Sequence, residues 1–162
     1  MKTPANIGGH PVHPMLIPFP FALWTFSLIA DAIYYFFDHN ALSIWDDISF
    51  YTIAGGTVGA VMAAVPGIID YFSIKDPKVS KIAAWHARLN VLALLIFGAN
   101  LYLRTDKGSS LVGRSLTIPV LLSILGIILI SISGWLGGEM VYKHAVAVDA
   151  ETDEGDKPAR FS

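Results

Sequence analysis

The chain contains no cysteine among its 162 residues. It therefore forms no internal disulfide, offers no thiolate to a metal or an iron–sulfur cluster, and cannot attach a c-type haem covalently. Charged residues are also scarce, at 15%, and the net charge of -2 comes without a basic stripe. We therefore expect no nucleic-acid partner. The HExxH, GxSxG and phosphate-binding glycine-loop motifs are absent too, so the sequence identifies no catalytic residue and leaves open whether the protein is an enzyme.

Apolar residues, by contrast, make up 54% of the chain and gather in four long runs. These runs cover about residues 15–37, 48–72, 82–103 and 116–141. Each supplies close to the ~20 residues that a helix needs to cross a bilayer core of ~30 Å, and lipid cannot satisfy free backbone groups. The sequence therefore predicts an all-α, integral membrane four-helix bundle over residues 1–148. An even number of crossings places both termini on the same side.

The distribution of lysine and arginine between the runs predicts the orientation. The connection at residues 73–81 carries three lysines, whereas the one at residues 38–47 carries no Lys or Arg. The positive-inside rule thus places the lysine-rich connection and both termini in the cytoplasm, although Arg104, Lys107 and Arg114 weigh against it. Residues 149–162 are rich in Asp and Glu, and this composition predicts a disordered acidic tail.

Small residues spaced four apart predict where the helices approach closely. Gly55 and Gly59 have this spacing in the second run, and Gly134 and Gly138 have it in the fourth. Such pairs let helix backbones come together in lipid, where no hydrophobic effect acts between helices. The sequence therefore predicts close seams along the second and fourth helices, and the same motifs also suit a homodimer.

Four of the five histidines fall on one membrane face once the crossings are counted. His10 and His13 precede the first run, His86 opens the third, and His144 follows the fourth. His39 falls on the opposite face, where we expect it to be solvated. Imidazole is the commonest neutral ligand for haem iron and transition metals, so this face is the candidate site.

Two ligand pairs are expected within this group. His13 and His86 form the first pair, and His10 and His144 the second. Histidines on facing transmembrane helices hold haem b in bundle cytochromes, and the same residues suit a transition metal such as zinc, iron or copper. Each can also be an ordinary amphipathic side chain at the membrane interface.

Three further polar residues lie near the same face. Asp70 ends the second run, Glu139 lies in the last turns of the fourth, and Asn90 shares a helix face with His86 because the two are four residues apart. We expect all three to orient imidazoles by hydrogen bonding. Asp70 and Glu139 would also serve as ligands if a metal rather than haem is bound.

Asp31 is the one ionisable residue well inside the first run, about four turns from its start and nearer the opposite face. A charged group is costly there and is a functional candidate by default. The competing interpretation is a carboxyl group that faces the bundle and is hydrogen-bonded to Thr57, Asn100 or a tyrosine.

Several motifs together resemble one known family. They are GHPVHPMLIPFP (residues 9–20), Asp31, AVPGIID (64–70), HARLN (86–90) and GWLGGEMVYKH (134–144). The combination resembles the bacterial membrane-protein family catalogued as domain of unknown function 2231, over about residues 8–148. The resemblance implies a four-helix protein of the bacterial inner membrane with no assigned activity. Relatives joined to Rieske-type or cytochrome modules imply a link to electron transfer.

The leading functional hypothesis is a membrane protein that binds haem b or a transition metal at the histidine face for electron transfer. Its partners would be the lipid bilayer and a redox protein or a quinone. One alternative is a metal-dependent membrane hydrolase or oxidase in which the metal activates water and a carboxylate acts as base. Another is a non-catalytic membrane scaffold or subunit.

Overall fold

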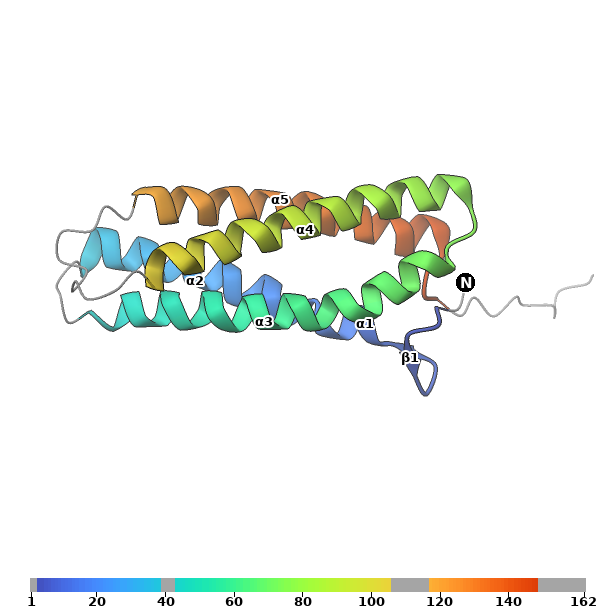
Figure 1. The fold of residues 1–162 in the computed structure, drawn as a ribbon, viewed down its shortest axis with the longest axis horizontal. Coiled ribbons are helices and arrows are strands. Elements are labelled where there is room, and N and C mark those ends of the chain that lie inside the picture. The colour runs from blue at the N-terminus through green and yellow to red at the C-terminus, as the bar shows by residue number, and fades with distance from the viewer. Residues whose placement is uncertain (1–2, 39–42, 106–116, 149–162) are drawn as a thin grey trace, which may run out of the picture.

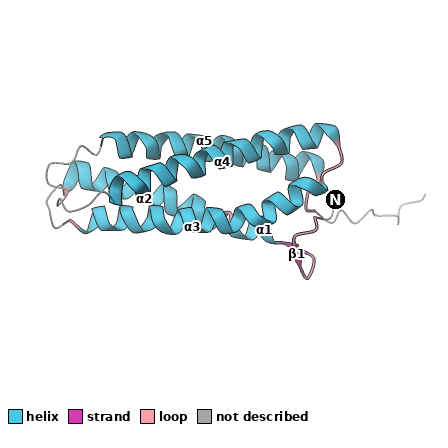
Figure 2. Ribbon diagram, viewed as in Figure 1, coloured by secondary structure: helices cyan, strands magenta, loops and turns pink. Residues whose placement is uncertain are grey.

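The computed structural model describes residues 3–38, 43–105 and 117–148. Within these ranges the chain begins with a two-stranded antiparallel hairpin and continues almost entirely as helix (Figure 2). The elements are β1 (Asn6–Ile7), β2 (His10–Pro11), α1 (Val12–Leu16), α2 (Pro18–Phe37), α3 (Ile44–Ser73), α4 (Pro77–Thr105) and α5 (Thr117–His144). Four segments, with α1 and α2 counted as one, are long and apolar enough to cross a membrane. This confirms the predicted all-α membrane bundle.

Polar residues mark the starts of two helices. The Ser43 hydroxyl accepts a hydrogen bond from the Trp45 amide at 3.3 Å, and two aspartates follow in the first turn of α3, where the helix dipole favours acids. Asp76 Oδ1 accepts one from the Lys78 amide at 2.7 Å as α4 begins. These signals explain why both helices start a few residues before the apolar runs from which the spans were predicted.

The four long helices form one bundle in which each helix has two neighbours. α2 packs along α3 and α4 along α5, and the two pairs meet where α3 contacts α4 and α2 contacts α5. α2 and α4 run in the same direction (Figure 1). The N-terminal hairpin and the end of α5 lie at the same end of the bundle, which also holds the α3–α4 connection.

An aromatic stack occupies the centre of the bundle. The rings of Trp24 in α2 and Phe97 in α4 have centroids 4.1 Å apart and planes within 10° of each other. Ile53, Ala93 and Ile130 complete this buried cluster. Many large apolar side chains are exposed on the outer faces of the helices, as lipid contact requires.

Two glycines allow the stack to form. A Cβ at Gly56 of α3 would lie 2.6 Å from Trp24 Cδ1, and a Cβ at Gly126 of α5 would lie 2.5 Å from Phe97 Cε2. Each helix thus gives up a side chain so that an aromatic ring can pack against its backbone, the close approach that drives association in lipid.

The predicted seam along the second span is confirmed, but the one along the fourth is wrong in position. A Cβ at Gly59 would contact Pro20 at 3.3 Å, whereas one at Gly134 would meet nothing within 4 Å. Gly138 faces only a residue of its own helix. Spacing permits close contact but does not fix which face turns inward, and in α5 that face carries Gly126 and Gly137.

We expect Gly126→Ala to destabilise the bundle, because the new methyl group would overlap the Phe97 ring. Overpacking of this kind costs about 1–3 kcal/mol in free energy of unfolding. Gly134→Ala on the same helix is the matched control and should be neutral or slightly stabilising, since open space surrounds it. Thermal unfolding in detergent measures both, and equal melting temperatures for the two variants would contradict the assignment of the seam.

Candidate functional site

His13 packs against α3 one turn before the proline inside that helix, Pro66. Pro66 has no amide hydrogen and so donates no hydrogen bond to the preceding turn. His13 Nδ1 lies 2.7 Å from the Ala63 carbonyl oxygen in that turn. Because a carbonyl only accepts, Nδ1 carries the hydrogen and donates. Gly67 makes room for the ring, since a Cβ there would lie 2.8 Å from Nδ1.

His86 is held against α5 in the same manner. Its Nδ1 donates to the Ser133 carbonyl oxygen at 2.8 Å and lies 3.0 Å from the Ser133 hydroxyl, which itself donates to the His86 carbonyl at 3.2 Å. Gly137 lies beside the ring, and a Cβ there would be 3.3 Å from His86 Cε1. On the other side of the ring, Asn90 Nδ2 lies 2.9 Å from His86 Nε2 and donates to it.

The two imidazoles meet inside the bundle. Their ring centroids are 6.2 Å apart and their planes are nearly perpendicular, at 88°. In the neutral form of each ring, these bonds place the hydrogen on Nδ1 and the lone pair on Nε2. The Nε2 of His86 accepts from Asn90, whereas His13 Nε2 receives no hydrogen bond from the described residues. The pair therefore presents the arrangement that metal-ligating histidines use, in which a backbone carbonyl fixes the tautomer.

Among the described residues, no hydrogen bond or ring contact is seen between His10 and His144, the second predicted pair. His10 is exposed in the β-hairpin, and His144 is the last residue of α5. Within the described ranges no group of three or more His, Cys, Asp or Glu side chains could hold a metal ion. The site at this end of the bundle therefore consists of His13, His86 and the groups that hold their rings. His39 lies outside the described residues.

The two predicted carboxylates have other partners. Asp70 Oδ1 accepts a hydrogen bond from the Ala5 amide at 2.9 Å and so ties the N-terminal hairpin to the end of α3. Glu139 forms an ion pair with Lys143 one turn later, at 3.1 Å, and the lysine side chain is 67% exposed. We expected these acids to orient the imidazoles, but the rings hydrogen-bond to backbone carbonyls of α3 and α5 instead.

A second polar cluster lies toward the opposite end of the bundle. Both Asp31 carboxylate oxygens accept from Arg104, from Nη1 at 2.9 Å and from Nη2 at 2.6 Å, and the two side chains are only 2% and 4% exposed. Arg104 also donates to Ser49 Oγ at 3.0 Å and to Asn100 Oδ1 at 2.9 Å. The sequence placed Asn100 near Asp31 but missed Arg104, which lies just beyond the apolar run and was counted as a loop charge.

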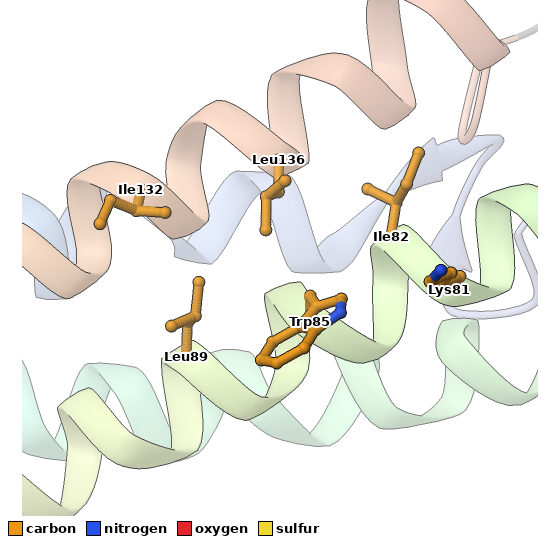
Figure 3. Close-up of a pocket in the computed structure, with 6 residues that line it drawn as sticks. All are labelled: Lys81, Ile82, Trp85, Leu89, Ile132 and Leu136. Carbon is orange, nitrogen blue, oxygen red and sulfur yellow. The ribbon is translucent and has the colours of Figure 1, made fainter.

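An apolar pocket of about 340 Å³ lies between α4 and α5. Its walls are formed by Lys81, Ile82, Trp85, Leu89, Ile132 and Leu136 (Figure 3). Neither His86 nor Ser133 lines it, although Ile82 and Leu89 lie within four residues of His86 on the same helix. The pocket offers no metal-ligating histidine or carboxylate and is not part of the candidate site.

The fold and the buried polar clusters define a polytopic α-helical membrane protein. The chain matches the family described as "Predicted membrane protein (DUF2231)" over residues 9–150, and it belongs to that family. This confirms the resemblance seen in the sequence motifs. Comparison with curated proteins and with solved structures gives no match.

We expect Asp31→Asn to destabilise the protein strongly, because it removes the carboxylate that accepts two hydrogen bonds from the buried Arg104 guanidinium group. Breaking a buried pair by removing one partner costs about 3–5 kcal/mol. Glu139→Gln is the matched control, since it breaks an exposed pair worth about 0–1 kcal/mol. Chemical unfolding in detergent gives both free energies, and a loss no larger for Asp31→Asn than for the control would show that the buried pair is not essential.

Proposed function

We propose that this protein is a membrane haem b protein that transfers electrons, and that His13 and His86 would hold the haem iron. The observation that carries the proposal is the imidazole pair itself, two rings from different helices with centroids 6.2 Å apart. Each ring donates Nδ1–H to a helix carbonyl, which reserves Nε2 for a ligand.

The spacing of the rings suits one metal ion between them. Each metal–nitrogen bond would be about 2.0–2.1 Å, so two imidazoles that share one ion would have centroids about 6 Å apart or less. Haem supplies four nitrogens of its own, and two histidines complete its coordination. A bare zinc, iron or copper ion needs further protein ligands. A site with two imidazoles and no third ligand in the described residues therefore favours haem b.

The residues around the rings would define how the group is held. The Ala63 and Ser133 carbonyls keep each imidazole in one tautomer and one orientation, and Gly67 and Gly137 leave the space that the rings occupy. The Asn90 amide has to turn away from His86 before its lone pair can bind iron. The chain has no cysteine, so the attachment would be non-covalent. When bound, haem iron supplies one-electron chemistry.

We also infer that the histidine end of the bundle faces the cytoplasm of a bacterial cell. The lysines of the α3–α4 connection lie at that end and are exposed. Arg104, which argued for the opposite orientation, is committed to the buried pair with Asp31 and is not a loop charge. The positive-inside rule then favours the cytoplasmic assignment more strongly than the sequence did.

The test is an absorption spectrum of the purified protein, oxidised and then reduced with dithionite. We expect a Soret band and a reduced α-band that are lost in His13→Ala and in His86→Ala, since each removes one imidazole that would hold the iron. His10→Ala and His144→Ala are the matched controls, because they change histidines at the same end of the bundle that lie outside the pair. Both should keep the wild-type spectrum.

Other results would overturn the proposal in distinct ways. A colourless protein that holds zinc, iron or copper by elemental analysis would support the metal-dependent enzyme instead. If the protein is expressed with ample haem supply and contains neither haem nor metal, the non-catalytic membrane scaffold or subunit is the interpretation that remains. A spectrum that survives in His86→Ala would refute the ligand assignment even if haem is bound.

A further inference from the structure

The buried stripe of α2 recurs in α4 with the same spacing. Four buried positions of α2 follow one another at intervals of four, three and four residues, and four positions of α4 do the same. They are Pro20, Trp24, Ser27 and Asp31 in α2, and Ala93, Phe97, Asn100 and Arg104 in α4. The same register continues toward the histidine end of the bundle. His13 lies eleven residues before Trp24, and His86 lies eleven residues before Phe97, so the two histidines also occupy equivalent positions.

The returning helices α3 and α5 show a second matching stripe. Their buried positions at intervals of four, three and seven residues are Ser49, Ile53, Gly56 and Ala63 in α3, and Pro119, Ser123, Gly126 and Ser133 in α5. Gly67 and Gly137 continue the two series, four residues on. Every one of these positions in the first helix pair thus has a buried or ring-contacting counterpart in the second.

Contacts within each half match as well as positions. The bond from His13 Nδ1 to the Ala63 carbonyl has its counterpart in the bond from His86 to Ser133. The approach of Trp24 to Gly56 has its counterpart in that of Phe97 to Gly126.

A lateral hydrogen bond near the ion pair is also repeated. Ser49 Oγ donates to the Ser27 carbonyl at 3.2 Å, and at the equivalent positions Asn100 Nδ2 donates to the Pro119 carbonyl at 2.9 Å. The donor lies on α3 in the first half and on α4 in the second. The same two helix positions are joined in both halves, although the residue types differ.

Contacts between the halves are those that a twofold axis predicts, because residues close to such an axis contact their own counterparts in the other half. His13 contacts His86, Trp24 stacks on Phe97, and Asp31 pairs with Arg104, which lies 73 positions later in the chain. The contact of α3 with α4 corresponds to that of α5 with α2, as such an axis requires. Because α2 and α4 run in the same direction, the axis runs along the bundle (Figure 1).

We infer that the chain is a duplicated two-helix unit, with Val12–Ser73 and Pro77–His144 paired about a twofold axis along the membrane normal, and that Asp31 and Arg104 determine which units pair. The inner surface of each unit is an interaction surface whose partner is the other unit. It is independent of what the histidines bind. Parallel repeats of this kind are a known way to build membrane proteins.

The unlike residues at one equivalent position give the pairing its specificity. Two copies of the first unit would bring two buried Asp31 carboxylates together on the axis, and two copies of the second would bring two Arg104 guanidinium groups together. Like charges in a low dielectric repel strongly, so only unlike units pair. The unlike pair therefore specifies association within one chain and opposes association between like units of different chains.

The test exchanges the polar pair between the halves of the full chain. Asp31→Arg and Arg104→Asp, each alone, set like charges opposite one another and should abolish monodisperse protein in mild detergent. The variant S27N/D31R/N100S/R104D moves each charge, with the polar residue one turn before it, to the equivalent position. It should recover most of the wild-type yield and melting temperature. The matched control S27D/D31S moves the carboxylate one turn out of register with Arg104 and should stay impaired.

A circular permutant tests the two units directly. It begins at residue 76 and joins the end of the chain to residue 3 through a flexible linker, so the order of the halves is reversed. We expect a monomer with a melting temperature close to that of the wild type. An exchange variant as impaired as the single variants would overturn the role of Asp31 and Arg104, and a permutant that fails to fold would overturn the two-unit architecture. Neither result bears on haem binding.

Discussion

Polar groups buried between lipid-facing helices must find their partners inside the bundle, because hydrocarbon supplies none. The two polar clusters obey this constraint in different ways. Asp31 accepts hydrogen bonds from Arg104 through both carboxylate oxygens, while His13 and His86 each donate Nδ1–H to a helix carbonyl. Among the described residues, Trp24 Nε1 is the one buried side-chain nitrogen or oxygen without a partner. This nitrogen lies against the backbone at Gly56, where the stacked position of the Trp24 ring leaves it without an acceptor.

A feature could be predicted from the sequence when it depends on residues close together in the chain, and could not when it depends on residues far apart. The four spans could be predicted because apolar length is a local property. The contact of Asn90 with His86 could be predicted because residues four apart share a helix face. The pairing of Asp31 with Arg104 could not, because it depends on the register of two helices that are far apart in sequence. The arginine also lies one residue past the end of the apolar run, so a span defined by hydropathy ends before it and assigns it to the following loop.

The same reasoning explains why the structure pairs only two of the four histidines that were expected to form the site. Counting crossings assigns a residue to a membrane face, but it says nothing about its distance from the bundle axis. His10 and His144 are on the predicted end, yet neither forms with His13 and His86 a group that could hold a metal ion. A longer-range signal was available in the equal spacing from His13 to Trp24 and from His86 to Phe97. It was hard to see because the two halves share few identical residues and keep mainly the sizes and positions that the axis requires.

The polar clusters at the two ends of the axis differ in whether their side chains satisfy each other's hydrogen bonds. Where the counterparts are unlike, as with Asp31 and Arg104, each satisfies the other and no binding capacity remains for a ligand. Where they are identical, as with His13 and His86, each ring directs its Nδ1–H at a helix carbonyl, and the two rings do not hydrogen-bond to each other. Asn90 donates to His86 Nε2, but its counterpart Ile17 has no side-chain donor for His13. Among the described residues, the imidazole nitrogen of this pair without a hydrogen bond therefore lies at the histidine end of the axis, on His13.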